Sequence, residues 1–286
     1  LSSFQLQDLQ KSPHISVVLM VTQEHMDYHK NKKEYVDAKI PIVKYQTEED
    51  YAIINSDYAN SLKIGSQSKG HKFYFSRKQK VEHGCFVQGL EIVISDSALK
   101  LPTADLKLKG VHNLENICAA ALAAHLAGVS FKAIKKTASK FKGLEHRLEL
   151  VAQKNGITFY NDSFSTTPET AIAAIKSFND PEILILGGSS KNSDFSELGT
   201  TINLAKNIKA IILVGEEAEN IKSVLVSHSL LHFFEGAKTM SEIFAQIKLV
   251  AVNGDVVILS PACASFGMFK NYQERGEQFK EEVTKW

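Results

Sequence analysis

The 286-residue sequence has little of what marks several protein classes. It contains only three cysteines, Cys85, Cys118 and Cys263, which are far apart, so neither a disulfide framework nor a zinc site follows. Reduced thiols in a cytoplasmic protein fit this usage best. No apolar run approaches the ~20 residues of a membrane span. The net charge of +1 gives no sign of a nucleic-acid or membrane surface.

An initial Met is also missing. The chain begins Leu1-Ser2-Ser3, which is typical of the middle of a protein, so we expect a fragment. At this length it can form two domains of ordinary size. The sequence shows no pattern that indicates a subunit interface, and we expect a monomer that binds neither nucleic acid nor membrane.

The first half of the chain has mixed features. An apolar run at residues 15–21 indicates a buried strand, and residues 32–43 have helical spacing that Pro41 must interrupt. Residues 71–108 alternate and turn, which indicates antiparallel hairpins. Two helices are predicted at residues 114–126, with Asn113 as a plausible N-cap, and at 131–141.

The second half alternates regularly between strands and helices. This rhythm predicts a parallel, doubly wound sheet, and the domain boundary is expected beside Lys142-Gly143. The expected strands are residues 157–160, 183–186, 210–214, 232–234 and 256–259, and the expected helices are residues 168–178, 196–206, 217–226 and 239–250, with a final helix after the last strand.

The turn after the last strand raises a specific question. Four small residues, 262–265, precede a stretch in which Phe266, Phe269 and Tyr272 recur at a helical spacing of three. Small residues there would let a ligand approach backbone N–H groups at a helix start. Alternatively, the segment is a tight turn in which Ser265 is an ordinary N-cap.

Polar clusters stand at four such strand ends or helix starts. Taken singly, His25 could be a surface residue, Lys39 a solvated helix lysine and Asn113 only a cap. Four clusters together favour a ligand site. They are Glu24, His25, Asp27 and Lys39; His112, Asn113 and Asn116; His146 and Arg147 with residues 161–168; and residues 187–191 with the segment around Ser265.

The order of these motifs resembles the Mur ligases, ATP-dependent amino-acid ligases of peptidoglycan precursor synthesis. The resemblance covers residue 1 to about residue 279, and the C-terminal block is its most specific part. The motifs are LSSFQL, TQEHMDYH, YVDAKIPI, LKGVHNLENICAA, GLEHRLELV, NDSFSTTPETA, ILGGSSKNSDF and LSPACASFGMFKNYQERGEQF.

The resemblance implies an α/β fold with two domains. Residues 1–142 would be the second part of an incomplete central Mur-type ATPase domain, with a mixed sheet and helices. Residues 143–286 would be a Rossmann-like, doubly wound C-terminal domain that binds the amino acid. The pattern is most like the branch that adds D-glutamate to UDP-N-acetylmuramoyl-L-alanine through an acyl phosphate, with ATP and Mg2+ as cofactors.

Roles for individual residues follow from the same resemblance. His25 and a carbamylated Lys39 would hold Mg2+, since a buried lysine loses its proton readily and its carbamate offers oxygen ligands. Asn113 and Asn116 share one helix face and would meet the edge of adenine. Arg147 would reach the phosphates with its planar fork, and His25, Lys39 and Arg147 would be catalytic.

Asp162 would accept hydrogen bonds from the ribose hydroxyls. The residues that correspond to the D-glutamate pocket are Thr166, Lys191, Ser265, the Phe266 backbone and Tyr272.

The sequence departs from this branch in several places. Phe164 stands where the branch usually has Lys in an Asp-Ser-Lys-Ala-Thr-Asn pattern; Ser165 and Thr167 differ as well, and Tyr272 replaces a frequent Phe. The G-x-x-G-K-[ST] loop of the family does not occur in the 286 residues. The nearest pattern, residues 65–72, has His71 after its last glycine and is interpreted as a flexible loop. We therefore expect the chain alone to be inactive.

Two other functions stay open. The first is a related amide ligase with another amino acid, such as another Mur ligase or a folylpolyglutamate synthase. The second is a non-catalytic nucleotide-binding remnant that has lost the phosphate loop. The C-terminal SPACASFGMF block argues against the first alternative, whereas Phe164 leaves it open.

Overall fold

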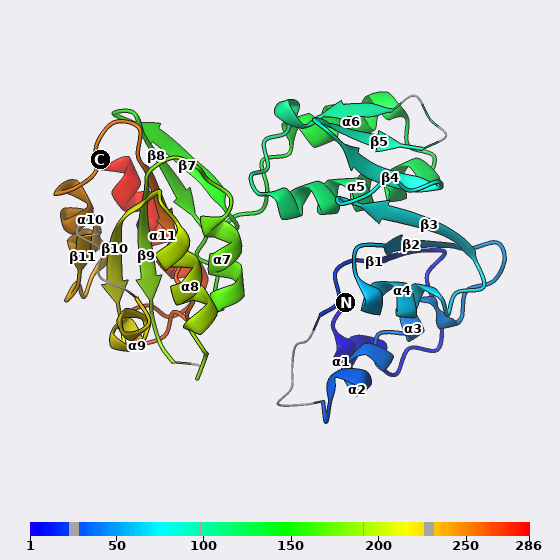
Figure 1. Cartoon of the computed structure of the whole chain (residues 1–286), viewed down its shortest axis with the longest axis horizontal. Coiled ribbons are helices and arrows are strands. Elements are labelled where there is room, and N and C mark those ends of the chain that lie inside the picture. Colours follow the sequence, from blue (N-terminus) through cyan, green and yellow to red (C-terminus); the bar gives the residue numbers. More distant parts are fainter. Residues whose placement is uncertain (23–28, 96, 98, 191, 226–231) are drawn as a thin grey trace. The chain divides into compact units, whose positions relative to one another are not determined.

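The computed structural model of the chain describes residues 1–22, 29–95, 97, 99–190, 192–225 and 232–286. It forms two compact units, Leu1–Lys107 with Val111–Phe141 and Leu108–Gly110 with Lys142–Trp286. Each unit holds one six-stranded sheet with helices against it (Figure 1). Among the described helices, none is long and apolar enough to cross a membrane. The assignment of functions to the two units stays a prediction.

The first sheet is mixed, with the order β1-β2-β3-β4-β5-β6. Neighbours from β1 to β4 are parallel, and neighbours from β4 to β6 are antiparallel. The mixed sheet expected for the first domain is therefore confirmed. The strands are β1 (Ile15–Val18), β2 (Tyr51–Asn55), β3 (His71–Ser76), β4 (Gly84–Gln88), β5 (Glu91–Ile94) and β6 (Lys100–Pro102).

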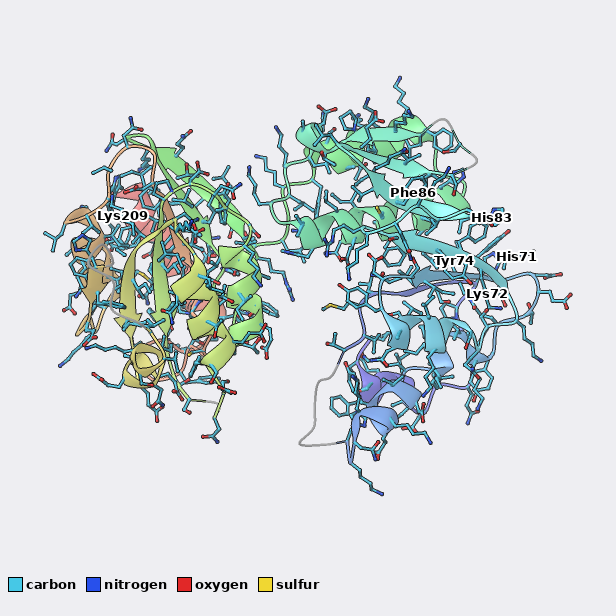
Figure 2. All side chains as sticks on the ribbon, in the orientation of Figure 1. His71, Lys72, Tyr74, His83, Phe86 and Lys209 are labelled. Carbon is cyan, nitrogen blue, oxygen red and sulfur yellow. The ribbon has the colours of Figure 1, made fainter. Side chains whose placement is uncertain are left out.

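The prediction of antiparallel hairpins over residues 71–108 is right for β4 to β6 and wrong for β3. Alternation identifies a strand but not its direction. After β3, the Asp57 carboxylate accepts bonds from the Ser76 hydroxyl and the Arg77 N–H, and these bonds turn the chain away from a hairpin. The chain returns at His83, whose carbonyl accepts from the Tyr74 N–H (2.9 Å) (Figure 2).

Helices cover both faces of this sheet. Side chains of the short helices α2, α3 and α4 pack with Ala52 and Ile54 of β2. Successive strand residues point to opposite faces, so Asn55 faces the other side, where its amide donates to Glu115 of α5 (3.2 Å). The helices are α1 (Ser3–Leu6), α2 (Lys32–Asp37), α3 (Pro41–Lys44), α4 (Ala59–Gly65), α5 (Val111–Leu126) and α6 (Phe131–Lys140).

The glycine-rich stretch after α4 is not the flexible loop that the sequence suggested. The buried Ser68 hydroxyl donates to Gln46 Oε1 (2.7 Å) and accepts from the Gly70 N–H (2.9 Å). A Cβ at Gly70 would lie 2.5 Å from the Asp50 carbonyl oxygen, so only glycine fits. These glycines serve a packed turn before β3.

The second sheet is doubly wound, as predicted. Its order is β11-β10-β9-β12-β8-β7, and all neighbours are parallel except the edge strand β7, which the sequence analysis missed. The strands are β7 (Glu149–Lys154), β8 (Ile157–Asn161), β9 (Glu182–Gly187), β10 (Ile208–Val214), β11 (His232–Phe234) and β12 (Val256–Leu259).

Two helical layers enclose the apolar strands of this sheet. Side chains of α7, α8 and α9 pack on the face that carries Leu184 and Ile258. Side chains of α10 and α11 pack on the face that carries Ile183 and Val257. On β10, Lys209 pairs with the buried Asp255 at 2.6 Å (Figure 2). The helices are α7 (Pro168–Ile175), α8 (Ser196–Leu204), α9 (Ala218–Ser223), α10 (Met240–Lys248) and α11 (Tyr272–Thr284).

Two helix starts differ from the sequence-based expectations. The final helix α11 begins at Tyr272, where Asn271 Oδ1 accepts from the Glu274 N–H (2.8 Å), so Ser265 is neither a helix start nor an N-cap. The spacing of three between Phe266, Phe269 and Tyr272 suggested a helix, but residues 266–271 form turns and bends instead. Helix α5 begins at Val111, which places Asn113 inside its first turn and not at its N-cap.

A buried carboxyl at the start of β9 makes stability depend on pH. Burial raises the pKa of Glu182 from 4.5 to about 8, and Oε1 accepts from Asn207 Nδ2 (2.8 Å). The folded state therefore binds a proton that the unfolded state releases above pH 4.5, and stability falls as pH rises toward 8.

We expect Glu182→Gln to remove this dependence because glutamine mimics the protonated acid. The difference in unfolding free energy between wild type and variant should shift by a few kcal/mol, on the order of 1.4 per pKa unit, in favour of the variant between pH 5 and pH 9. Denaturant unfolding followed by fluorescence of Trp286, the single tryptophan, measures it. A pH-independent difference would contradict the prediction.

Candidate active site

The loops that leave β9 and β12 meet at the topological switch point of the second sheet. The helix after β9 covers one face, and the helix after β12 covers the other. Gly187 N–H donates to the Pro261 carbonyl (2.8 Å), and Ser189 N–H donates to the Ala264 carbonyl (3.0 Å). Ligands of open α/β sheets bind at such a point, outside the carboxyl ends of the strands.

The small residues of this region let the two loops pack on each other. Gly188 has a φ of +151°, and an added Cβ would overlap the Ala264 carbonyl oxygen and lie 3.1 Å from Cys263 Cβ. The sequence suggested instead that small residues admit a carboxylate to a helix start. That explanation is wrong for Ser265, since no helix begins there.

Arg275, to which the sequence analysis gave no role, ties these loops together. It is only 3% exposed on the first turn of α11. Nε donates to Ser163 Oγ (3.0 Å), Nη1 to the carbonyls of Cys263 and Ala264 (both 3.3 Å), and Nη2 to the carbonyls of Ser163 (2.8 Å) and Cys263 (3.2 Å). A guanidinium has five N–H donors, and each has an acceptor here.

The charge of Arg275 has no acidic partner among the described residues. Burial lowers the pKa of the guanidinium to about 10, which leaves it charged at neutral pH. Buried charges are usually paired, and here only carbonyl and hydroxyl dipoles compensate the cation. The switch point therefore has a built-in positive potential, which favours an anionic ligand.

Arg147, in contrast, is exposed and lies over an aromatic ring. Its Cζ is 4.1 Å from the centre of the Phe164 ring. The Phe164 ring meets Tyr272 edge-on at 4.7 Å, and Tyr272 meets His146 at 5.7 Å. The two candidate residues Arg147 and Tyr272 are thus brought together through Phe164, the residue that departs from the family pattern.

The neighbouring His146 belongs to an ion-pair network. Asn161 Nδ2 donates to His146 Nδ1 (2.9 Å), while Asn161 Oδ1 accepts from the Ser163 N–H (3.1 Å), which fixes the amide orientation. His146 in its neutral form therefore carries its proton on Nε2, the atom 3.7 Å from Glu277.

That tautomer argues against a metal centre here. Ligand atoms of Glu145, His146 and Glu277 lie within 4.8 Å of one another. A protonated Nε2 cannot ligate a cation, however, and the Lys280 ammonium already lies 2.7 Å from Glu277 and 3.7 Å from Glu145. We interpret the cluster as an ion-pair network.

Asp162 follows β8 and is 7% exposed. Its Oδ1 accepts from the Leu148 N–H (3.0 Å), and its Oδ2 accepts from the Ser260 hydroxyl (2.8 Å). Burial raises the pKa of this carboxyl to about 6, although the hydrogen bond from Ser260 lowers it. Both oxygens therefore already accept hydrogen bonds from neighbouring loops, and a sugar hydroxyl would have to share them.

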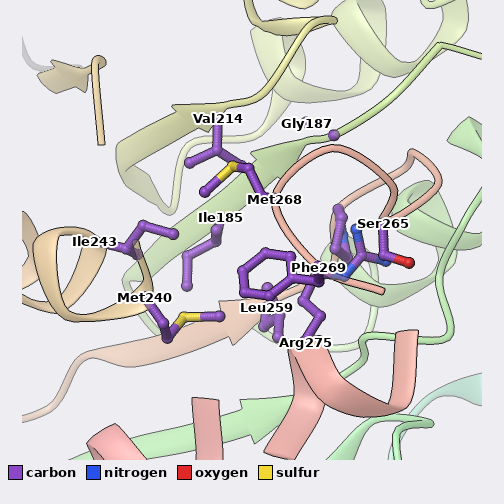
Figure 3. Close-up of a pocket in the computed structure, with 12 residues that line it drawn as sticks. Ile185, Gly187, Val214, Met240, Ile243, Leu259, Ser265, Met268, Phe269 and Arg275 are labelled. Carbon is purple, nitrogen blue, oxygen red and sulfur yellow. The ribbon is translucent and has the colours of Figure 1, made fainter. Parts of the chain in front are cut away.

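A small pocket lies under the switch point (Figure 3). Its walls are mainly apolar side chains from β9, β10, α10 and β12, and the figure shows Ser265 and Arg275 beside them. Of the four predicted amino-acid-binding residues that the structure describes, only Ser265 lines this pocket. Phe266 is 63% exposed, Thr166 is half-buried, and Lys191 lies outside the described residues.

The first unit holds the predicted adenine-binding pair. Asn116 Nδ2 donates to Asn113 Oδ1 (3.0 Å), so the two amides lie side by side, as their spacing predicts. Glu115, which stands between them in the sequence, is 6% exposed. Its carboxylate accepts hydrogen bonds from Arg77 Nε (2.9 Å) and Asn55 Nδ2 (3.2 Å). This buried network fixes the rotation of α5. The sequence analysis missed it, because nothing in the spacing joins β2, β3 and α5.

The predicted metal ligands are only partly described. His25 lies outside the described residues. Lys39 was expected on a helix, but it lies in the turn between α2 and α3. It is half-buried, and its Nζ is 4.7 Å from the centre of the Tyr35 ring.

The five bonds of Arg275 predict its effect on stability. Arg275→Lys keeps the charge but cannot reach all four acceptor groups, and buried carbonyls without donors cost about 1–3 kcal/mol each. We expect the unfolding free energy of the second unit to fall by roughly 2–5 kcal/mol.

Arg147→Lys is the matched control. The same change at an arginine without such bonds should alter the unfolding free energy by less than about 0.5 kcal/mol. Urea unfolding followed by fluorescence of Trp286, which packs on Phe159 and Phe244, measures both variants. Equal effects of the two substitutions would contradict the role assigned to Arg275.

Comparison with known proteins assigns the family. The model of the Mur ligase middle domain matches residues 1–124, and that of the Mur ligase glutamate ligase domain matches residues 146–263. Curated relatives named UDP-N-acetylmuramoylalanine--D-glutamate ligase include those of Acetivibrio thermocellus (40% identity over 99% of this chain and 62% of the relative) and Bacillus cereus (38% over 100% and 62%). The chain thus spans less than two thirds of their length.

Solved structures show the same fold at low identity. MurF from Acinetobacter baumannii gives a TM-score of 0.74 at 18% identity, covering 96% of this chain and 61% of that one. MurF ligase from Thermotoga maritima in complex with ADP gives 0.69 at 17% identity, covering 96% and 63%. With two matching family models and relatives of about 40% identity along its whole length, the chain belongs to the Mur ligase family.

Proposed function

We propose that this chain is the central and C-terminal part of an ATP-dependent amide ligase that adds D-glutamate to UDP-N-acetylmuramoyl-L-alanine. Relatives that carry this name match 99–100% of the chain. The observation that carries the proposal is the Arg147 guanidinium. It is exposed, lies over the Phe164 ring and has no hydrogen-bond acceptor in the described part of the protein.

Each unit, taken by itself, offers groups that fit one part of a nucleoside triphosphate. A guanidinium whose N–H edge meets no protein acceptor suits phosphate oxygens, which it binds in pairs. The amides of Asn113 and Asn116 lie 3.0 Å apart and offer donors and acceptors of the kind that an adenine edge requires. ATP supplies the phosphoryl group that activates the substrate carboxylate, by way of an acyl phosphate. Arg147 would orient the phosphates and stabilise their charge.

Asp162 has a more limited part in this proposal. It would accept from the ribose with lone pairs that the Leu148 N–H and the Ser260 hydroxyl do not use. Its first task is to hold the segment that presents Arg147, because its Oδ1 bonds the residue that follows this arginine.

The amino acid would bind at the switch point of the second sheet. The positive potential of Arg275 suits the carboxylates of glutamate, and Ser265 lies in the adjoining pocket. Lys191, Thr166, the Phe266 backbone and Tyr272 are proposed as further contacts. A monomeric state and a cytoplasmic location stay predictions.

His25 and Lys39 are proposed to hold Mg2+, the lysine as its carbamate. Lys39 is half-buried, and carbamate formation requires that its amine first lose a proton. The contact of its Nζ with the Tyr35 ring suits the ammonium form, so carbamate formation would replace an attractive contact with a metal bond.

A related amide ligase with another amino acid is the second candidate. Phe164 favours it, since the D-glutamate-adding branch usually has a cation at this position. The two candidates differ in the amino acid that drives phosphate release.

The direct test uses the full-length protein that the gene encodes. With UDP-N-acetylmuramoyl-L-alanine, ATP and Mg2+, D-glutamate should drive phosphate release, while L-glutamate and D-aspartate should not. Arg147→Ala should lower the rate by about 10²–10³, the usual loss for one preorganised donor. Release driven by a different amino acid would support the second candidate, and no release with any would refute both.

The carbamate makes a separate prediction. Lys39→Ala in the full-length protein should abolish ligation, because the metal loses its oxygen ligands, and added short-chain carboxylic acids should restore part of the rate. Steady-state phosphate release with and without acetate measures this. Lys39→Arg is the control, since its bulk should block rescue. Ordinary activity of Lys39→Ala would show that no carbamate is needed.

A further inference from the structure

Two arginines of the second unit have opposite environments. The five N–H groups of Arg275 all donate to protein acceptors. Among the described residues, the Arg147 guanidinium donates no hydrogen bond and forms no ion pair. Its Cζ lies over the Phe164 ring, 4.1 Å from the ring centre, and its charge acts on the nearby Asp162 carboxyl, whose pKa burial raises and this charge lowers. The Arg275 guanidinium thus stabilises the fold, whereas the Arg147 guanidinium is held in place without bonding a protein acceptor.

Phe164 is itself held in place by neighbouring aromatic rings and a backbone hydrogen bond. Its ring meets Tyr272 at 4.7 Å with an interplanar angle of 90°, and Tyr272 meets His146 at 5.7 Å and 84°. His146 is 5% exposed, and its Nδ1 accepts from Asn161. The Phe164 N–H also donates to the His146 carbonyl (3.0 Å). A side chain on an exposed loop is thereby joined to the buried end of β8.

Stacking of this kind orients a guanidinium without using its donors. The cation is attracted to the face of the ring, and this attraction uses none of the N–H groups, which stay available to an acceptor from solvent. A stacked arginine therefore loses less conformational freedom when it binds an oxyanion, and binding costs less entropy. An exposed arginine without this support would sample many rotamers.

We propose that Phe164, backed by Tyr272, is a positioning residue that holds the Arg147 guanidinium for an oxyanion of the phosphate class. The inference rests on the proposed function, in which Arg147 meets the phosphates. It also gives a role to the aromatic side chain at a position where the D-glutamate-adding branch usually has lysine. Phe164 supplies geometry there and no additional charge.

The test measures binding of inorganic triphosphate to the 286-residue chain. NMR titration is followed at the backbone amides of residues 163–165. Phe164→Leu should raise the dissociation constant by about three- to ten-fold, because a cation–π contact of this strength is lost. Phe164→Tyr, which keeps the ring face, should retain wild-type affinity. Phe141→Leu, a matched change at an exposed phenylalanine of the first unit, should have no effect.

A double-mutant comparison separates the possible outcomes. Arg147→Ala should weaken binding more than Phe164→Leu, and adding Phe164→Leu to it should change nothing further. An equal loss in both backgrounds, or wild-type affinity of Phe164→Leu beside a weakened Arg147→Ala, would overturn the positioning role alone. Wild-type affinity of Arg147→Ala would overturn both this role and the proposed phosphate contact.

Discussion

The second unit depends on one buried cation. Arg275, on the first turn of α11, joins the loop that precedes its helix, after β12, to the loop after β8, which is 112 residues away in sequence. Burial of a charge is costly unless hydrogen bonds compensate it, and here every donor is used. A cation in the first turn of a helix also opposes the helix dipole. Both effects destabilise the folded state, whereas the hydrogen bonds of Arg275 hold the two loops at the switch point in one defined arrangement.

That arrangement determines what the rest of the site can do. Because Ser163 is held by Arg275, the loop that continues to Phe164 leaves β8 in a fixed direction. Phe164 then lies against Tyr272 and under Arg147, and the Asp162 carboxylate holds the backbone next to Arg147. The exposed Arg147 guanidinium is thus connected through these contacts to the buried Arg275 guanidinium. A similar principle applies in the first unit, where the buried Glu115 fixes the helix that carries Asn113 and Asn116.

Much of this fold was predictable from the sequence. Apolar strands alternating with helices gave the doubly wound sheet, and the spacing of Asn113 and Asn116 placed both on one face. Errors arose where specific hydrogen bonds decide and apolar spacing carries no information. The direction of β3 depends on the contact of Asp57 with Arg77, and the start of α11 depends on the local cap Asn271. Arg275 was missed because its acceptors are mostly backbone carbonyls, which carry no sequence signal. The one available hint was a cation in an otherwise acidic helix start.

The most direct test of this account compares the two guanidinium groups. Hydrogen exchange at the side-chain Nε–H groups of Arg275 and Arg147 can be measured by NMR in the 286-residue chain. Exchange at Arg275 is expected to be slowed by several orders of magnitude, because its N–H groups are buried and bonded, whereas Arg147 is expected to exchange at the rate of an exposed arginine. Fast exchange at Arg275, or equal protection of the two residues, would contradict it.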